Sequence, residues 1–164
     1  MQRRGFLVLA AAALALSGCA SKFMRYSGPE VTQIVVNKGA RRMYLLHHDT
    51  VLTAYDIDLG FAPVGHKEIE GDGRTPEGDY QVDRHNPNSD FYLSQGIDYP
   101  RPADIDNARR LGQPPGGDIF IHGKPNGIRQ TPADWTAGCI SVTNREMREI
   151  YAMVRNGTPI RINP

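Results

Sequence analysis

A cysteine and a histidine in the last third of the chain have the types and spacing of a nucleophile and its base. Cys139 lies in WTAGCISV, residues 135–142, and His122 belongs to DIFIHG, residues 118–123. An ordinary thiol is only a few per cent thiolate at neutral pH, so a reactive cysteine needs a base or a positive dipole beside it. His122 precedes Cys139 by 17 positions, and the loop between them is long enough to bring both side chains to one edge of a sheet.

Glycines stand next to both candidate residues. Gly123 and Gly138 each remove a side chain beside a reactive group, as the close approach of a substrate requires. The consecutive N–H groups of Gly138 and Cys139 are candidates for stabilising a developing oxyanion. A cysteine within a strand is most often a small, inert, buried side chain. Because Cys139 follows a loop and a glycine, the sequence favours a reactive thiol and leaves the inert role as an alternative.

The other polar residues give weaker signals. The remaining histidines, His47, His48, His66 and His85, show no metal-ligand spacing. The sequence therefore predicts neither a metal nor a cofactor. Arg74, in the turn-rich stretch GDGRTPEGDYQV (71–82), is a candidate for substrate binding.

Short strands of alternating residues are predicted along most of the chain. In order, they are VTQIVVNK (31–38) and RRMYLLHH (41–48), which form a hairpin, TVLTAYDIDLG (50–60), a strand with Tyr80 and Val82, FYLSQGIDYP (91–100), DIFIHG (118–123), CISV (139–142) and TPIRIN (158–163). In the third strand one face carries Val51, Thr53, Tyr55, Ile57 and Leu59.

Two short helices complete the pattern. The first is predicted within residues 102–117 and is followed by a Gly/Pro loop. For the second, Thr143 and Glu146 fit a capping box, and Asn156-Gly157 supplies the stop. Its apolar stripe consists of Met147, Ile150, Tyr151 and Val154. The sum is a mostly β fold with two short helices, which favours a β-sandwich or an open barrel over a parallel α/β sheet.

The first residues predict export. Arg3 and Arg4 precede an apolar run, Phe6 to Leu16, which has the length of a signal-peptide core and is too short to span a bilayer. We expect a signal peptide at 1–18, a tether at 19–30 and one domain at 31–163. Removing the two arginines takes Lys+Arg from 19 to 17 against 18 acids, so the chain lacks the basic excess typical of nucleic-acid binding.

The stretch LSGC (16–19) is similar to the lipobox of bacterial lipoproteins, in which the cysteine is lipidated. Cys19 is therefore the expected anchor, with ordinary cleavage after Ala20 as the alternative. In either case Cys139 is the only thiol left, and no intramolecular disulfide is possible. RRGFL (3–7) also resembles a loose twin-arginine signal, which leaves both Sec and Tat export open. Because Ala20 rather than Asp follows Cys19, we expect a periplasmic protein held on the outer membrane.

Three separated motifs resemble the L,D-transpeptidase catalytic domain, also called the YkuD-type domain. IHGKPNG (121–127) and TAGCISV (136–142) are similar to its His-Gly and Ser/Thr-x-Gly-Cys signature. GDGRTPEGDY (71–80) is similar to its Gly/Lys-or-Arg/Thr-Pro-x-Gly stretch. The resemblance covers about residues 31–163.

The resemblance implies an exported, mostly β enzyme that acts on the stem peptides of peptidoglycan. Cys139 would attack the carbonyl next to diaminopimelate and form a thioester as D-Ala leaves, while His122 moves the proton. Gly138 and Cys139 amides would hold the oxyanion. Thr136, at the Ser/Thr position of the motif, and Gly123 would bind the substrate. The acceptor would be an amine of a neighbouring stem or of a lipoprotein.

Two departures from the family pattern leave the outcome open. Many members have His before the Gly-Cys pair and Arg or Asn two residues after the cysteine, whereas this chain has Ala137 and Ser141. A hydrolase that releases crosslinks or wall-attached lipoproteins is therefore an alternative, as is a non-catalytic wall-binding lipoprotein. A sortase is disfavoured, because it needs an arginine on a strand after the cysteine, and Arg145 and Arg148 fall on the predicted helix.

Overall fold

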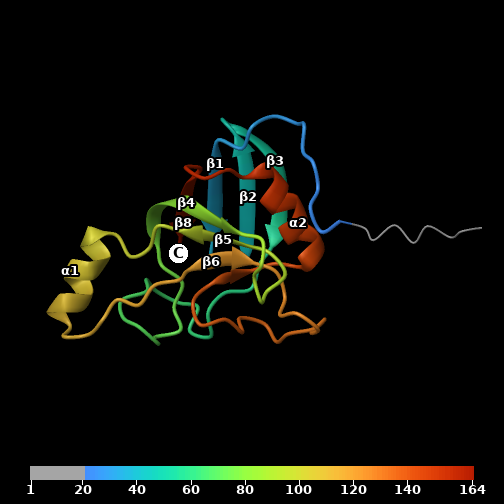
Figure 1. Cartoon of the computed structure of the whole chain (residues 1–164). Coiled ribbons are helices and arrows are strands. Elements are labelled where there is room, and N and C mark those ends of the chain that lie inside the picture. Colours follow the sequence, from blue (N-terminus) through green and yellow to red (C-terminus); the bar gives the residue numbers. More distant parts are fainter. Residues whose placement is uncertain (1–20) are drawn as a thin grey trace, which may run out of the picture.

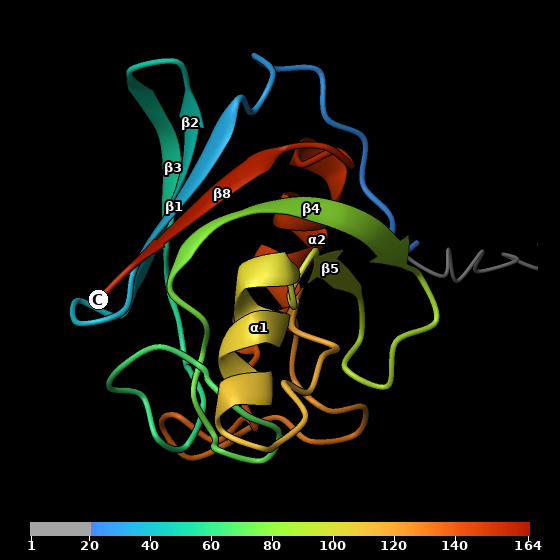
Figure 2. The same ribbon diagram turned by 90° about the vertical axis from the view of Figure 1, so that its left-hand side faces the viewer.

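An eight-stranded, strongly curved sheet is the main feature of the computed structural model, which describes residues 21–164 (Figures 1 and 2). The strands are β1 (Gln33–Asn37), β2 (Arg42–His47), β3 (Thr50–Asp56), β4 (Gly78–Asn86), β5 (Ser94–Ile97), β6 (Phe120–His122), β7 (Ile140–Ser141) and β8 (Pro159–Asn163). The helices are α1 (Pro102–Arg110) and α2 (Asn144–Met153). Each strand predicted from the sequence is present, and the mostly β, open-barrel expectation is confirmed.

The order of strands across the sheet is β3-β2-β1-β8-β4-β5-β6-β7. The predicted hairpin is the antiparallel pair β1–β2. Two neighbouring pairs, β1–β8 and β6–β7, are parallel. The last strand of the chain, β8, therefore lies in the middle of the sheet. Strands β6 and β7 lie at the edge opposite β3.

Alternating burial explains the central strands. In β1 the buried positions are Ile34 and Val36, and in the neighbouring β8 they are Ile160 and Ile162. The third predicted strand follows this rule only in part, because β3 ends at Asp56 and its register with β2 shifts between Leu45 and Leu46. Tyr55, Ile57 and Leu59 are buried as expected, but Val51 is 52% exposed. The register shift separates Val51 from the buried face.

Helix α2 lies inside the curve of the sheet and packs against β5 and β6 (Figure 2). Its capping box is present as predicted, since the Thr143 side chain accepts from the Glu146 N–H and the Glu146 carboxylate accepts from the Thr143 N–H. Met147 and Ile150 are fully buried, which stabilises the fold by about 2 kcal/mol each. The helix ends at Met153, before the predicted Asn156-Gly157 stop, because Val154 is already extended.

Helix α1 projects from the body of the molecule beyond the end of β4 and β5 (Figure 1). It begins with Pro102, and the Asp104 carboxylate accepts from the Arg101 N–H at 2.8 Å. Asp104 also accepts from the Tyr80 hydroxyl at 3.2 Å, which ties the helix to β4. Only Asp104 and Ala108 of this helix are buried.

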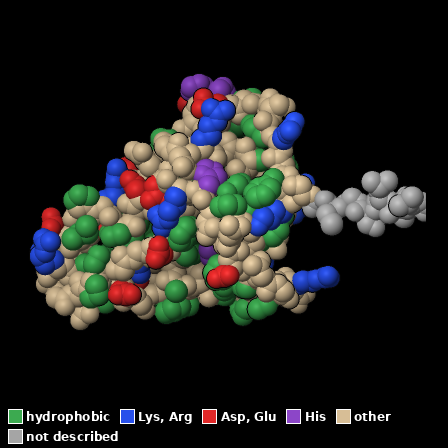
Figure 3. Space-filling model, viewed as in Figure 1, with side chains coloured by type: hydrophobic (Ala, Val, Ile, Leu, Met, Phe, Trp, Pro, Cys, Tyr) green, Lys and Arg blue, Asp and Glu red, His purple; other side chains and the backbone are tan. Residues whose placement is uncertain are grey.

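Residues 21–32 contain no helix or strand, and Phe23 lies 6.2 Å from the Tyr151 ring of α2. The predicted signal peptide and Cys19 lie outside the described residues. Basic and acidic side chains are interspersed on the face shown in Figure 3, in line with the near-zero net charge. Within residues 21–164, no helix has the length and apolar character that a membrane span requires.

Candidate active site

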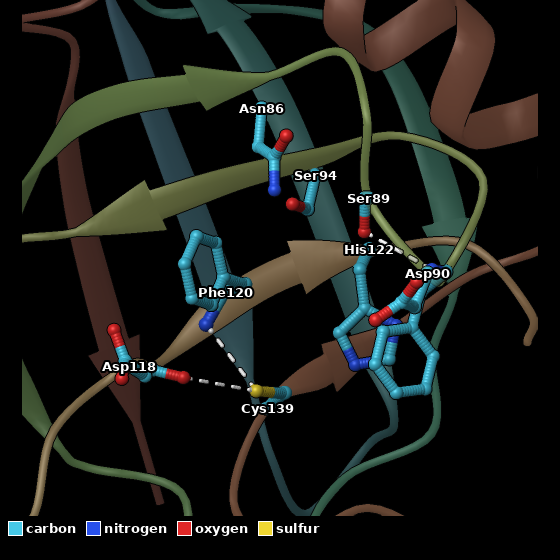
Figure 4. A pocket seen from close by; sticks show the side chains of 9 residues that line it. Asn86, Ser89, Asp90, Ser94, Asp118, Phe120, His122 and Cys139 are labelled. Atoms are coloured by element: carbon cyan, nitrogen blue, oxygen red, sulfur yellow. Dashed lines mark hydrogen bonds between the residues drawn. The ribbon is translucent and has the colours of Figure 1, made fainter.

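The parallel pairing of β6 with β7 brings Cys139 and His122 to one face of the sheet. Ile121 is in register with Ile140, and both are fully buried in the core. Because side chains alternate along a strand, Cys139 and His122 point away from that core on the opposite face. They are diagonal neighbours on adjacent strands, and both line one cavity of about 380 Å³ (Figure 4). The cavity is lined by Asn86, Ser89, Asp90, Phe91, Ser94, Asp118, Phe120, His122 and Cys139.

Cys139 is half-buried and is held by backbone groups. Its sulfur accepts a hydrogen bond from the Phe120 N–H and donates one to the Asp118 carbonyl oxygen, each at 3.4 Å. Burial raises the pKa of the Cys139 thiol above its ordinary value, although the Phe120 N–H acts in the opposite direction. The resting group at neutral pH is therefore a thiol, and it needs a base to become a nucleophile.

His122 is held in a tautomer that can accept a proton at Nε2, and it makes no hydrogen bond to the Cys139 sulfur in this structure. Its Nδ1 lies 2.7 Å from the Gly123 carbonyl oxygen, which only accepts hydrogen bonds, so Nδ1 carries the proton and Nε2 keeps its lone pair. The ring lies 4.6 Å from the Phe91 ring and 5.6 Å from the Trp135 ring. Burial lowers the pKa of His122 to about 4, and the positive charge of Lys124 acts in the same direction. The imidazole is consequently neutral at pH 7 and can accept a proton.

The loop that carries Cys139 is fastened at both ends to residues 58–61. The Thr136 N–H donates to the Leu59 carbonyl at 3.1 Å, and the Phe61 N–H donates to the Thr136 carbonyl at 2.9 Å. After the cysteine, Ser141 and Asp58 exchange two backbone hydrogen bonds of 2.8 and 2.9 Å. Residues 137–139, between Thr136 and strand β7, therefore form a short loop whose two ends are fixed.

Thr136 closes this loop from the inside. Its side chain is buried, and Oγ1 donates to the Cys139 carbonyl at 2.7 Å while accepting from the Gly138 N–H at 3.1 Å. Thr136, which we expected to contact substrate, thus lies beneath Cys139 and holds its backbone. The predicted oxyanion donors are affected too, because the Gly138 N–H is engaged by Thr136. Among the hydrogen bonds of the described residues, the Cys139 N–H has no acceptor, so it is the available donor of the pair.

Position 138 needs a glycine because protein atoms lie close to it, and not because a substrate must approach it. It has a φ of 134°, and a Cβ on it would lie 2.6 Å from the Arg74 carbonyl oxygen. Gly60 packs in the same place, where a Cβ would lie 2.0 Å from the Gly73 carbonyl oxygen and 2.9 Å from the Gly138 nitrogen. The motif GDGRTPEG therefore contacts, through backbone atoms, residues 136–139, which we call the nucleophile loop after the candidate nucleophile Cys139.

Arg74 and Gly123, the other two residues assigned to substrate binding, have protein neighbours. The Arg74 guanidinium donates to the Glu68 carboxylate at 2.8 Å, and Arg74 is not among the residues that line the cavity. A Cβ on Gly123 would lie 2.5 Å from Asn144 Oδ1 and 3.0 Å from the Phe91 carbonyl oxygen. Gly123 is therefore enclosed by protein atoms, and the Arg74 side chain pairs with Glu68 outside the cavity.

A known family model matches most of the chain. The family model described as the L,D-transpeptidase catalytic domain, YkuD, matches residues 31–162. The chain belongs to the L,D-transpeptidase family. A search of curated proteins finds no significant match.

Solved structures share this fold. The helical cell shape determining protein Pgp2 from Campylobacter jejuni is 27% identical in its K307A mutant form, with a TM-score of 0.65 over 84% of this chain and 48% of that chain. Bd1075 from Bdellovibrio bacteriovorus is 24% identical, with a TM-score of 0.56 over 81% of this chain and 48% of that chain. An L,D-transpeptidase from Mycobacterium smegmatis shares the fold at 15% identity and a TM-score of 0.54, over 82% of this chain and 59% of that chain. The chain thus spans about half the length of the first two.

Several residues of this L,D-transpeptidase site were not among those predicted from the sequence. Phe91 and Trp135 enclose the His122 imidazole, and Asp118 has a φ of 53° as its carbonyl meets the thiol. Trp135 was detectable as the single tryptophan, four residues before Cys139. Phe91 reaches the site only through the loop between β4 and β5, which no local pattern reveals.

Ser141 and the remaining histidines lie outside the cavity of this L,D-transpeptidase. Ser141 is fully buried, and its backbone pairs with Asp58. His66 contacts the Asp104 carboxylate at 3.3 Å, and His85 contacts Asn156 Oδ1 at 2.6 Å. Across residues 21–164, no group of three or more His, Cys, Asp or Glu side chains is arranged to hold a metal ion.

Proposed function

We propose that this protein is a peptidoglycan L,D-transpeptidase that forms a thioester between Cys139 and a stem-peptide donor. One observation carries the proposal: the Cys139 thiol and the His122 imidazole, whose Nε2 is unprotonated, line the same cavity. Membership of the L,D-transpeptidase family supports the choice of stem peptides as substrate. Similarity to a protein that determines helical cell shape supports a role in wall remodelling.

Acylation begins from a neutral pair. As Cys139 Sγ attacks the carbonyl carbon next to diaminopimelate, the thiol proton moves to His122 Nε2, and the imidazolium is held by the Nδ1–H bond to Gly123. The Cys139 N–H stabilises the oxyanion of the tetrahedral intermediate. When the C–N bond breaks, His122 returns its proton to the leaving amine, and the acyl group remains on sulfur as a thioester.

Resolution of the thioester reverses these proton movements. An acceptor amine attacks the thioester carbonyl and gives its proton to neutral His122, which then protonates the Cys139 sulfur as it leaves. The product is a new amide bond, which crosslinks the wall or attaches a lipoprotein. If water takes the place of the amine, the same steps give hydrolysis.

The experiment is incubation of the purified protein with a tetrapeptide-bearing muropeptide, with and without a D-amino acid as acceptor amine. We expect a mass increase on Cys139 that corresponds to the tripeptide acyl group, followed by a product in which the D-amino acid replaces D-Ala. Cys139→Ala is the matched control and should retain the fold while losing both signals. Tripeptide as the sole product in excess acceptor would identify a hydrolase, and the absence of any adduct would reject the enzyme.

We also propose that the protein is exported and anchored through a lipid on Cys19, in the periplasm and on the outer membrane. The signal-like residues 1–18 and the LSGC stretch support this proposal. Metabolic labelling with an alkyne fatty acid should tag the wild-type protein and not Cys19→Ala, and membrane fractionation should give the same division. Equal labelling of the two would show that Cys19 is not the anchor.

A further inference from the structure

A row of residues crosses the sheet beside the nucleophile. Arg84 on β4 is in register with Gly96 on β5, and Gly96 is in register with Phe120 on β6. Phe120 precedes Ile121 as Cys139 precedes Ile140, so Phe120 and Cys139 stand side by side. All four lie on the face opposite the buried core, because the neighbouring pair Val82 and Ile97 is in the core.

The Arg84 side chain reaches along this row toward the cysteine. Its Cζ lies 4.5 Å above the centroid of the Phe120 ring, and Phe120 lines the catalytic cavity. Gly96 makes this path possible, since a Cβ on Gly96 would lie 2.7 Å from Arg84 Cζ. A register shift between Val82 and Arg84 marks a β-bulge, which is a device that re-aims a side chain.

Two carboxylates, those of Asp83 and Asp118, pair with the Arg84 guanidinium, and they differ in the number of hydrogen bonds and in exposure. Arg84 Nη1 donates to both carboxylate oxygens of Asp83, at 2.9 and 2.7 Å. Nη2 makes one longer bond, 3.2 Å, to the Asp118 carboxylate, which is 90% exposed. Asp118 therefore occupies one side of the guanidinium with a single, solvated contact, which a second carboxylate can replace.

We propose that Arg84 is a specificity-determining residue that binds a free carboxylate of the donor peptide, in exchange for Asp118. The inference rests on the proposed function, because it needs Cys139 to attack a peptide. Adjacent strands are about 4.8 Å apart, so a guanidinium above Phe120 lies about one to two strand spacings from the sulfur. If one residue follows the attacked carbonyl, the carboxylate carbon of that residue lies about one residue length, about 3.5 Å, from the attacked carbon. This reach matches the donor of the proposed function, which ends one residue after the attacked bond, and assigns Arg84 as the residue that selects it.

The test compares two donors that differ only at the end, one with a C-terminal carboxylate and one with a C-terminal carboxamide. For Arg84→Gln we expect KM for the carboxylate donor to rise about tenfold, with kcat and the carboxamide donor nearly unchanged. Asp118→Asn keeps the backbone carbonyl that meets the thiol and removes the competing charge, so KM for the carboxylate donor should fall. Opposite effects of the two variants on one donor are not expected from a structural role.

Gly96→Ala gives an independent variant that keeps the arginine. The added methyl group should push the guanidinium off Phe120 and raise KM for the carboxylate donor as Arg84→Gln does. Arg161→Gln, whose arginine pairs with Asp79 outside the cavity, is the control and should match wild type on both donors. Equal losses on both donors in Arg84→Gln, or wild-type KM in both Arg84→Gln and Gly96→Ala, would overturn the inference while leaving the proposed function intact. Failure of the wild-type protein to acylate Cys139 with either donor would instead overturn the proposed function.

Discussion

The hydroxyl of Thr136 decides where the backbone of Cys139 sits. It satisfies two backbone groups of the nucleophile loop, the Gly138 N–H and the Cys139 carbonyl, from a buried position. A buried hydroxyl with both partners satisfied is costly to remove, since its partners are left without hydrogen bonds. The same two bonds set the direction of the Cys139 N–H, which is the available oxyanion donor.

We expect Thr136→Val to lower the free energy of unfolding by about 2 kcal/mol and to slow acylation of Cys139 more than tenfold. Valine has nearly the same shape, so the loss reports the hydroxyl and not the volume. Thr136→Ser, which keeps the hydroxyl, should stay within about 1 kcal/mol of wild type. Urea denaturation and the rate of acyl-adduct formation by mass spectrometry measure the two effects. A serine variant as impaired as the valine variant would contradict this role.

At this scale, residue types located the candidate site better than they predicted which residues surround it. Cys139 and His122 could be named from their types and their glycine neighbours, and both line the cavity. Thr136 and Gly138 could be located, but their partners come from residues 58–61 and 73–74, which are more than 60 positions away in the chain. A local motif shows that a glycine is needed and does not show which atom lies against it.

Among the elements, hydrophobic alternation identified the strands and the hairpin β1–β2, and the capping box with its apolar stripe identified helix α2. Alternation did not identify the parallel pairs β1–β8 and β6–β7, because pairing between distant strands leaves no periodic trace in either strand. The pair β6–β7 nevertheless sets the site, since it places His122 and Cys139 on one face. The β-bulge that aims Arg84 was likewise outside the reach of the sequence, as its extra residue is visible only against its partner strand.

The close contact between the nucleophile loop and the GDGRTPEG loop predicts that a side chain at position 138 destabilises the protein. In Gly138→Ala the new methyl group meets the Arg74 carbonyl oxygen at 2.6 Å, and φ of 134° disfavours any side chain. Because the obstacle is backbone, we expect a loss of about 3 kcal/mol in the free energy of unfolding, together with loss of acylation. Gly39→Ala is the control, since its Cβ would find its nearest neighbour at 3.7 Å and no positive φ. Calorimetry showing equal midpoints for the two variants would refute the close contact.

For the molecule as a whole, a single buried imidazole gives stability a dependence on pH. Burial lowers the pKa of His122 to about 4 from its ordinary value of 6.5. Between these two values the unfolded chain binds a proton at this residue and the folded protein does not, so the free energy of unfolding falls as pH falls. The loss approaches about 1.4 kcal/mol per pH unit and about 3 kcal/mol in all by pH 4.

Asparagine at position 122 removes this titration, so the difference between wild type and His122→Asn in the free energy of unfolding should shrink by about 3 kcal/mol from pH 7 to pH 4. Asp72 and Asp134, whose pKa values are lowered, affect stability in a different pH range. Their contributions to the free energy of unfolding are lost only as pH falls below 3.8. Urea denaturation of both proteins at half-unit steps between pH 4 and pH 7.5 measures the difference directly. If the two curves of unfolding free energy against pH are parallel, His122 has the same pKa in the folded and unfolded states. The neutral imidazole that the proposed acylation step needs would then be lost below pH 6.5 and not retained to pH 4.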